Sequence, residues 1–183
     1  MRKTIKYFSA KDFKNYIKSF GFSNFSFNHS EDGKLLLSKC KDYAFISIGN
    51  VEKEEDADND IDLWANGPTN HWLPDSDNVL NIDFADVDNS GSMKYKNAMT
   101  EEQAKTIVDF IDRNNVKSVF IIHCGAGISR SGAVAKYIFD CVDEQEERKE
   151  NDDFFIFPEY PTCPNYYVYS MLKQYKQKKE NEK

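Results

Sequence analysis

Residues 116–132 read VKSVFIIHCGAGISRSG, and the pattern of side chains changes twice within this stretch. Residues 119–122 are continuously apolar, which predicts a strand buried on both faces. Apolar residues then return at helical spacing, as Val134, Ile138, Cys141 and Val142. The loop between them allows close backbone approaches because it is rich in glycine, at Gly125, Gly127 and Gly132. The stretch therefore predicts a strand, loop and helix of an α/β fold.

A cysteine and an arginine stand at the two ends of this loop, Cys124 and Arg130, with five small or uncharged residues between them. A cysteine thiol has an ordinary pKa of about 8.5, so a nucleophilic thiolate needs groups that stabilise its charge. We expect these groups to be Arg130, the Ser131 hydroxyl, the positive end of the following helix and the loop amides. A phosphoryl dianion suits the same donors. The backbone amides predicted to bind it are those of Gly125, Ala126, Gly127, Ile128, Ser129 and Arg130.

Positions 123–131 carry His-Cys, five residues and Arg-Ser, which resembles the signature of the cysteine-dependent protein tyrosine phosphatase superfamily. The sequence Ala-Gly-Ile-Ser-Arg-Ser-Gly is most similar to the dual-specificity branch. The resemblance implies that Cys124 forms a phosphocysteine, that Arg130 holds the phosphate oxygens and that Ser131 helps the thiolate to leave. It also implies that His123 orients the loop. The alternative is a buried cysteine at a tight turn, with the arginine in an ordinary ion pair.

A carboxylic acid is expected near this loop, because the leaving oxygen of a phosphoryl transfer benefits from a proton. Residues 81–91 read NIDFADVDNSG, and their alternating pattern predicts a strand that runs into a polar loop. Asp86 follows the expected strand end, where the resemblance places the acid, and we favour it as the proton donor. Asp88 and Asp83 are the alternatives, with Asp83 expected on the strand itself.

The chain has 183 residues, 40% of them hydrophobic, which predicts a single domain over residues 1–183. Its net charge of −7 disfavours a broad surface for nucleic acid or membrane. Without a long apolar run or a leader, the sequence predicts a soluble, cytoplasmic protein. Four cysteines without metal-ligand spacing agree with a reducing compartment, and we predict no metal and no cofactor. Under oxidation, Cys40 or Cys163 is a candidate partner for Cys124.

Strands that alternate with helices predict a three-layer α/β/α sandwich around a mainly parallel sheet, which by resemblance is of the phosphatase type. Residues 1–42 are interpreted as an N-terminal extension, with an edge strand over residues 3–8 and a helix capped by Ser9. Thr100 and Gln103 have the spacing of a capping box. The helix that follows them has the apolar stripe Ala104, Ile107, Val108 and Ile111.

Residues 52–62 contain seven carboxylates and one lysine, and we interpret residues 52–78 as an acidic, solvated surface loop. A substrate-facing insert is the alternative. Three large side chains of this segment either anchor it on the core or line the cleft; they are Trp64, His71 and Trp72.

Pro164 is expected to begin the final helix, with a frayed tail over residues 178–183. Asn165 has two interpretations that the sequence does not separate. It either supports the cysteine loop, as in related bacterial phosphatases, or simply belongs to the first turn of the helix.

These features together predict a metal-independent phosphomonoester hydrolase that acts on phosphorylated protein, with phosphotyrosine favoured. One alternative is an inactive phosphatase-like module that binds phosphorylated partners. Another is a phosphatase of a non-protein phosphate, such as a nucleotide, an RNA 5′ end or an inositol phosphate. Inositol lipids are disfavoured because the loop contains no lysine. Sulfur transfer and arsenate reduction also use a cysteine in an anion loop, but their sequence context differs.

Overall fold

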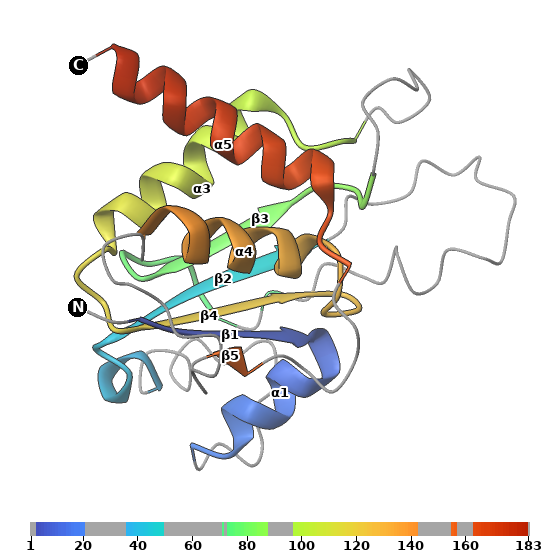
Figure 1. The fold of residues 1–183 in the computed structure, drawn as a ribbon. Coiled ribbons are helices and arrows are strands. Elements are labelled where there is room, and N and C mark those ends of the chain that lie inside the picture. The colour runs from blue at the N-terminus through green and yellow to red at the C-terminus, as the bar shows by residue number, and fades with distance from the viewer. Residues whose placement is uncertain are drawn as a thin grey trace, which may run out of the picture.

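The structure is a computed structural model in which residues 3–20, 36–49, 71, 73–87, 97–142, 155–156 and 163–182 are described. Strands and helices alternate along much of the chain (Figure 1). The strands are β1 (Thr4–Ser9), β2 (Tyr43–Gly49), β3 (Val79–Asp83), β4 (Val119–Cys124) and β5 (Phe155–Ile156). The helices are α1 (Ala10–Lys18), α3 (Glu101–Arg113), α4 (Arg130–Val142) and α5 (Tyr166–Asn181). Residues 36–39 are also helical.

The strands form one sheet in the order β3-β2-β4-β1-β5, and each ladder between them is parallel. The carboxyl ends of the strands therefore meet at one edge. At this edge Ser9 pairs with Cys124, and Gly49 pairs with Asp83. The expectation of an edge strand near the N-terminus is wrong, because β1 lies between β4 and β5. Residues 4–9 thus supply an inner strand of the sheet rather than part of an extension.

Helices cover both faces of the sheet, with α3, α4 and α5 on one face and α1 on the other (Figure 1). β4 shows why this arrangement forms, since its apolar residues serve two cores. Phe120 and Ile122 belong to the core beneath α3, α4 and α5, whereas Ile121 packs with Phe13 of α1. A strand that is apolar on both faces can be buried only between two layers. The predicted α/β class with a mainly parallel sheet is confirmed.

Local capping residues define where α1 and α3 begin, as the sequence predicts. The Thr100 hydroxyl accepts from the Gln103 amide at 3.2 Å, and the Gln103 side chain accepts from the Thr100 amide at 2.8 Å. Ser9 caps α1 by accepting from the Asp12 amide at 3.0 Å. The predicted stripe of α3 is buried, at Ala104, Ile107, Val108 and Ile111. These caps fix where each helix begins, and the stripe fixes the face that packs on the sheet.

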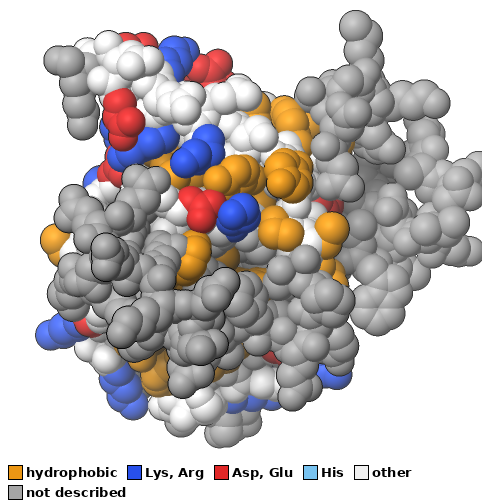
Figure 2. Space-filling view, viewed as in Figure 1, with side chains coloured by type: hydrophobic (Ala, Val, Ile, Leu, Met, Phe, Trp, Pro, Cys, Tyr) orange, Lys and Arg blue, Asp and Glu red, His pale blue; other side chains and the backbone are white. Residues whose placement is uncertain are grey.

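α5 departs from the prediction of a tail that frays after residue 178, because the helix continues to Asn181. Ion pairs to α3 explain the difference. Lys178 contacts Glu101 at 2.6 Å, and Lys179 contacts Asp109 at 2.6 Å and Asp112 at 2.7 Å. Basic and acidic side chains are intermixed on the described part of the face shown in Figure 2, with no large area of one sign there.

Several sequence predictions fall outside the described residues. These are the acidic run over residues 52–62, the side chains of Trp64 and Trp72, and the alternative acid Asp88.

Candidate active site

Residues 124–130, the cysteine loop, connect the end of β4 to the start of α4 at the carboxyl edge of the sheet. Ligand sites of open α/β sheets lie at this edge. The junction between β1 and α1 packs directly against the loop, where the Ala10 amide donates to the Gly125 carbonyl at 3.1 Å. Gly127 has φ +73°, and a Cβ there would lie 2.2 Å from the Ser9 nitrogen. Only glycine fits this position without displacing backbone.

The Cys124 thiol is buried and touches two hydrogen-bond donors. The Gly127 amide donates to Sγ at 3.3 Å, and the Ser131 hydroxyl oxygen lies 3.1 Å from Sγ. Both groups can direct a hydrogen at a negatively charged sulfur, which stabilises the thiolate form. Sγ also lies close to the N-terminal end of α4, whose dipole acts in the same sense.

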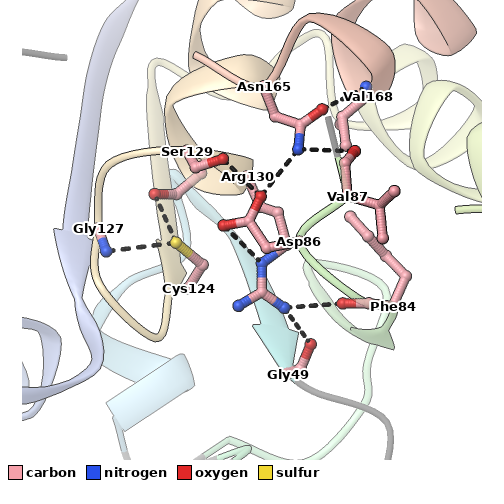
Figure 3. A network of polar contacts seen from close by, with 11 residues as sticks. Gly49, Phe84, Asp86, Val87, Cys124, Gly127, Ser129, Arg130, Asn165 and Val168 are labelled. Atoms are coloured by element: carbon pink, nitrogen blue, oxygen red, sulfur yellow. Dashed lines mark hydrogen bonds and ion pairs between the residues drawn. The ribbon is translucent and has the colours of Figure 1, made fainter. Parts of the chain in front are cut away.

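Two backbone carbonyls at the carboxyl edge of the sheet hold the guanidinium group of Arg130. Nη1 donates to the carbonyls of Gly49 at 2.9 Å and of Phe84 at 2.7 Å. The side chain is buried, and Nε lies 3.6 Å from Asp86 Oδ2 with no hydrogen-bond partner among the described residues. Nε and Asp86 Oδ2 thus form an ion pair without a hydrogen bond, and a buried guanidinium N–H without a hydrogen bond is rare. Figure 3 shows Arg130, Cys124 and Asp86 converging on one region.

Asp86 is the one of the three candidate acids that the described structure places at the loop. Its Oδ1 accepts from Ser129 Oγ at 2.5 Å and from Asn165 Nδ2 at 2.8 Å. Asp83 instead lies on β3, as the sequence predicts, and its Oδ1 is 3.0 Å from His71 Nε2. Oδ1 of Asp86 accepts two hydrogen bonds, whereas among the described residues Oδ2 makes only the longer ion-pair contact to Arg130 Nε and is the oxygen with room for a proton.

Asn165 satisfies both interpretations that the sequence left open. Its Oδ1 accepts from the Val168 amide at 3.0 Å, so it is the N-cap of α5. Its Nδ2 donates to Asp86 and to the Val87 carbonyl, and its backbone amide donates to the Ser129 carbonyl at 3.1 Å. One buried residue thus connects α5 and the acid segment through its side chain (Figure 3), and the cysteine loop through its backbone amide.

His123 lies on the α1 face of the sheet, where its ring stacks on Phe13 with centroids 4.2 Å apart. Burial, with a smaller contribution from the charge of His71, lowers the pKa of His123 to about 3. The imidazole is therefore neutral near pH 7 and does not act as an acid there. This agrees with the interpretation that His123 orients the loop rather than transferring a proton.

The sequence did not predict two features of the site. These are the backbone carbonyls that hold Arg130 and a hydrogen-bonded bridge between β2 and β3. Ser47 Oγ lies 2.7 Å from His71 Nδ1, and the opposite ring nitrogen contacts Asp83. For His71, this geometry favours the interpretation that it anchors its segment on the core. The only available sequence signal was Ser47 itself, a polar residue in the middle of the apolar strand YAFISIG. The carbonyls of Gly49 and Phe84 are backbone groups, for which a sequence carries no signal.

All four cysteines are free. Cys40 is buried in the core on the α1 face, whereas Cys163 is exposed. Within the part of the chain that is described, no group of three or more His, Cys, Asp or Glu is arranged to hold a metal ion. None of the described helices combines the length and the apolar character needed to cross a membrane.

Comparisons with known proteins yield no relative. No protein-family model matches the chain, and no curated protein or solved structure matches it significantly. The functional interpretation therefore depends on the motif and on the geometry of the site.

Proposed function

We propose that the chain is a metal-independent phosphomonoester phosphatase of the dual-specificity type, with phosphotyrosine protein as its favoured substrate. The observation that carries the proposal is the pairing of two groups at one sheet edge. The Cys124 thiol contacts two donors, and a buried Arg130 guanidinium has an N–H without a hydrogen-bond partner among the described residues. A nucleophile for phosphorus and a fork for its oxygens are the two requirements of this chemistry.

In the first step, the Cys124 thiolate attacks phosphorus and the bond to the substrate oxygen breaks. Arg130 and the loop amides bind the non-bridging oxygens, whose charge they stabilise in the transition state. Asp86 gives the proton on Oδ2 to the leaving oxygen, which departs as an alcohol or phenol. The products of this step are a phosphocysteine and an Asp86 carboxylate.

In the second step, the Asp86 carboxylate takes a proton from water while the water oxygen attacks phosphorus. The sulfur–phosphorus bond breaks, which releases inorganic phosphate and regenerates the thiolate. The Ser131 hydroxyl, 3.1 Å from Sγ, donates a hydrogen bond to the departing sulfur. Asp86 ends the cycle protonated, so both protons are balanced.

Two features orient Asp86 for this exchange. Ser129 and Asn165 both donate to its Oδ1, which fixes the carboxyl group over the loop and leaves Oδ2 towards Arg130. Because the donors come from the loop and from α5, the acid is positioned relative to the thiol by two separate elements. This arrangement supports a hydrolase over an inactive binding module, which does not need an oriented acid.

Hydrolysis of p-nitrophenyl phosphate in the presence of a chelator tests the proposal. The wild type should turn over, whereas Cys124→Ser and Arg130→Ala should lose activity by at least about a hundredfold. Cys163→Ser is the matched control, because it makes the same change at an exposed position, and it should retain full activity. Activity that survives Cys124→Ser would overturn the mechanism.

If the wild type is inert but binds phosphotyrosine peptides, the proposed hydrolase activity is wrong and the chain is a phosphate-binding module. If the wild type is active, comparison of phosphotyrosine peptides, phosphoserine peptides, nucleotides and inositol phosphates as substrates establishes the substrate class. Phosphotyrosine peptides are expected to give the highest kcat/KM. A higher value for a non-protein phosphate would overturn the substrate assignment and leave the mechanism in place.

A further inference from the structure

A hydrogen-bonded bridge joins β2 to β3 near the carboxyl ends of these strands. His71 Nδ1 lies 2.7 Å from Ser47 Oγ on β2, and His71 Nε2 lies 3.0 Å from Asp83 Oδ1 on β3. The His71 side chain is 20% exposed and that of Asp83 is 40% exposed, while Ser47 is buried. The bridge therefore lies near the carboxyl edge of the sheet, partly screened from water.

The chemistry of the three groups keeps the bridge intact in either state of the imidazole. The Asp83 carboxylate only accepts, so His71 Nε2 carries a hydrogen and donates it. The Ser47 hydroxyl donates to Nδ1 when the ring is neutral and accepts from Nδ1 when the ring is charged. Ser47 is too buried to act as a nucleophile, and both nitrogens of His71 are engaged. The arrangement suits a clamp rather than a second hydrolytic site.

The two strand ends that the clamp joins are those that hold Arg130. Gly49, whose carbonyl accepts from Nη1 at 2.9 Å, lies two residues after Ser47 on the same strand. Phe84, whose carbonyl accepts from Nη1 at 2.7 Å, directly follows Asp83. Gly49 and Asp83 are also the last paired residues of the β2–β3 ladder. Over these last pairs of the ladder, His71 adds a side-chain cross-link from Ser47 to Asp83 to the backbone pairing.

We propose that His71 is a positioning residue for oxyanion binding. By bridging Ser47 and Asp83, it sets the separation of the two carbonyls that orient the guanidinium, and so aims the remaining N–H groups of Arg130 at the oxyanion. This inference rests on the proposed function, because it takes a phosphate-like anion to be the ligand of Arg130. It assigns a role to a residue that does not touch the ligand.

Calorimetric titration with tungstate, a phosphate-like oxyanion, tests this role. The wild type should bind tungstate, and His71→Ala should bind it about tenfold more weakly, because a misaimed guanidinium loses part of a charge-assisted hydrogen bond. Asp75→Ala is the matched control. Asp75 accepts from the Asn81 amide at 3.0 Å, so it fastens the same segment to β3 away from Arg130. This control should bind within twofold of the wild type.

Two further measurements separate positioning from a general loss of stability. The rate at which iodoacetamide alkylates Cys124 should stay within twofold in His71→Ala, because the groups that contact Sγ, the Gly127 amide and the Ser131 hydroxyl, are not part of the bridge. Asp83→Asn combined with His71→Ala should be no weaker in tungstate binding than His71→Ala alone, since both changes break one bridge. Ser47→Ala is a smaller change that weakens the same bridge, and it serves if His71→Ala does not fold.

The outcomes distinguish the two proposals. A wild type that does not bind tungstate overturns the proposed function and the role of His71 with it. A wild type that binds tungstate, with His71→Ala and Ser47→Ala of equal affinity, overturns the positioning role alone. A loss in the Asp75→Ala control as large as that in His71→Ala also overturns it, because the effect would then belong to the segment as a whole.

Discussion

Replacing Gly127 by alanine tests whether the cysteine loop is shaped by its contact with the β1–α1 junction. A Cβ at this position would lie 2.2 Å from the Ser9 nitrogen and 2.5 Å from the Phe8 carbonyl carbon. These are backbone atoms of an inner strand, so they cannot move aside as a side chain tip can. Residue 127 also has φ +73°, which adds about 1–2 kcal/mol for a residue with a Cβ. With about 1–3 kcal/mol for overpacking, Gly127→Ala should lower the free energy of unfolding by about 2–5 kcal/mol.

Gly132→Ala provides the matched control, because Gly132 lies in the first turn of α4 and away from this contact. Among the described residues, its Cβ would meet only the Pro164 Cα, at 3.7 Å, which is an ordinary packing distance. Alanine is the better helix former, so this variant should be unchanged or up to about 1 kcal/mol more stable. Guanidinium denaturation followed by circular dichroism measures both variants. Equal stability of Gly127→Ala and wild type would refute the packing of the loop on Ser9.

Three other predictions concern the acid, the buried histidine and the helix layer. Asp86→Asn should lower kcat on phosphotyrosine peptides by about a hundredfold, and a full kcat together with an inactive Asp88→Asn would move the acid to Asp88. His123 has a pKa of about 3 in the folded chain and 6.5 in the unfolded chain. The unfolded chain therefore binds the proton more readily, so the free energy of unfolding is highest above pH 6.5 and falls as the pH is lowered towards 3. Its contribution should fall by about 2 kcal/mol between pH 7 and pH 5, a loss that denaturation of His123→Asn should not show. Equal pH slopes for the two proteins would contradict this. Lys179→Ala removes two contacts to α3 and should cost about 1 kcal/mol of unfolding free energy, less in high salt. A loss that salt does not reduce would argue against the ion pairs.

The parts of the fold that sequence could predict are those encoded locally. The strand, loop and helix around Cys124 follow from one apolar run, a glycine-rich loop and helical spacing. The Thr100 cap needs only a residue three positions away. The resemblance predicts Asp86 near the loop, and the structure places it there, at the edge where the parallel strands end. Its catalytic role stays a prediction.

The remaining features depend on contacts between distant segments. β5 is two residues long, so its pairing with β1 has almost no local signal. The ion pairs that extend α5 join residues about 70 positions apart, at Lys179 and Asp109. The bridge through His71 needs a serine, a histidine and an aspartate from three segments. Such contacts are selected by the packed sheet, and no short pattern in the chain specifies them.

Trapping of the phosphoenzyme is the most direct test of the proposed chemistry. The wild type is mixed with a phosphotyrosine peptide, quenched during turnover, digested and analysed by mass spectrometry. The phosphatase mechanism predicts one phosphoryl group on the peptide that contains Cys124, and none on that peptide in Cys124→Ser. Turnover with the phosphoryl group on another residue, or with none on Cys124 even when Asp86→Asn slows hydrolysis of the intermediate, would contradict it.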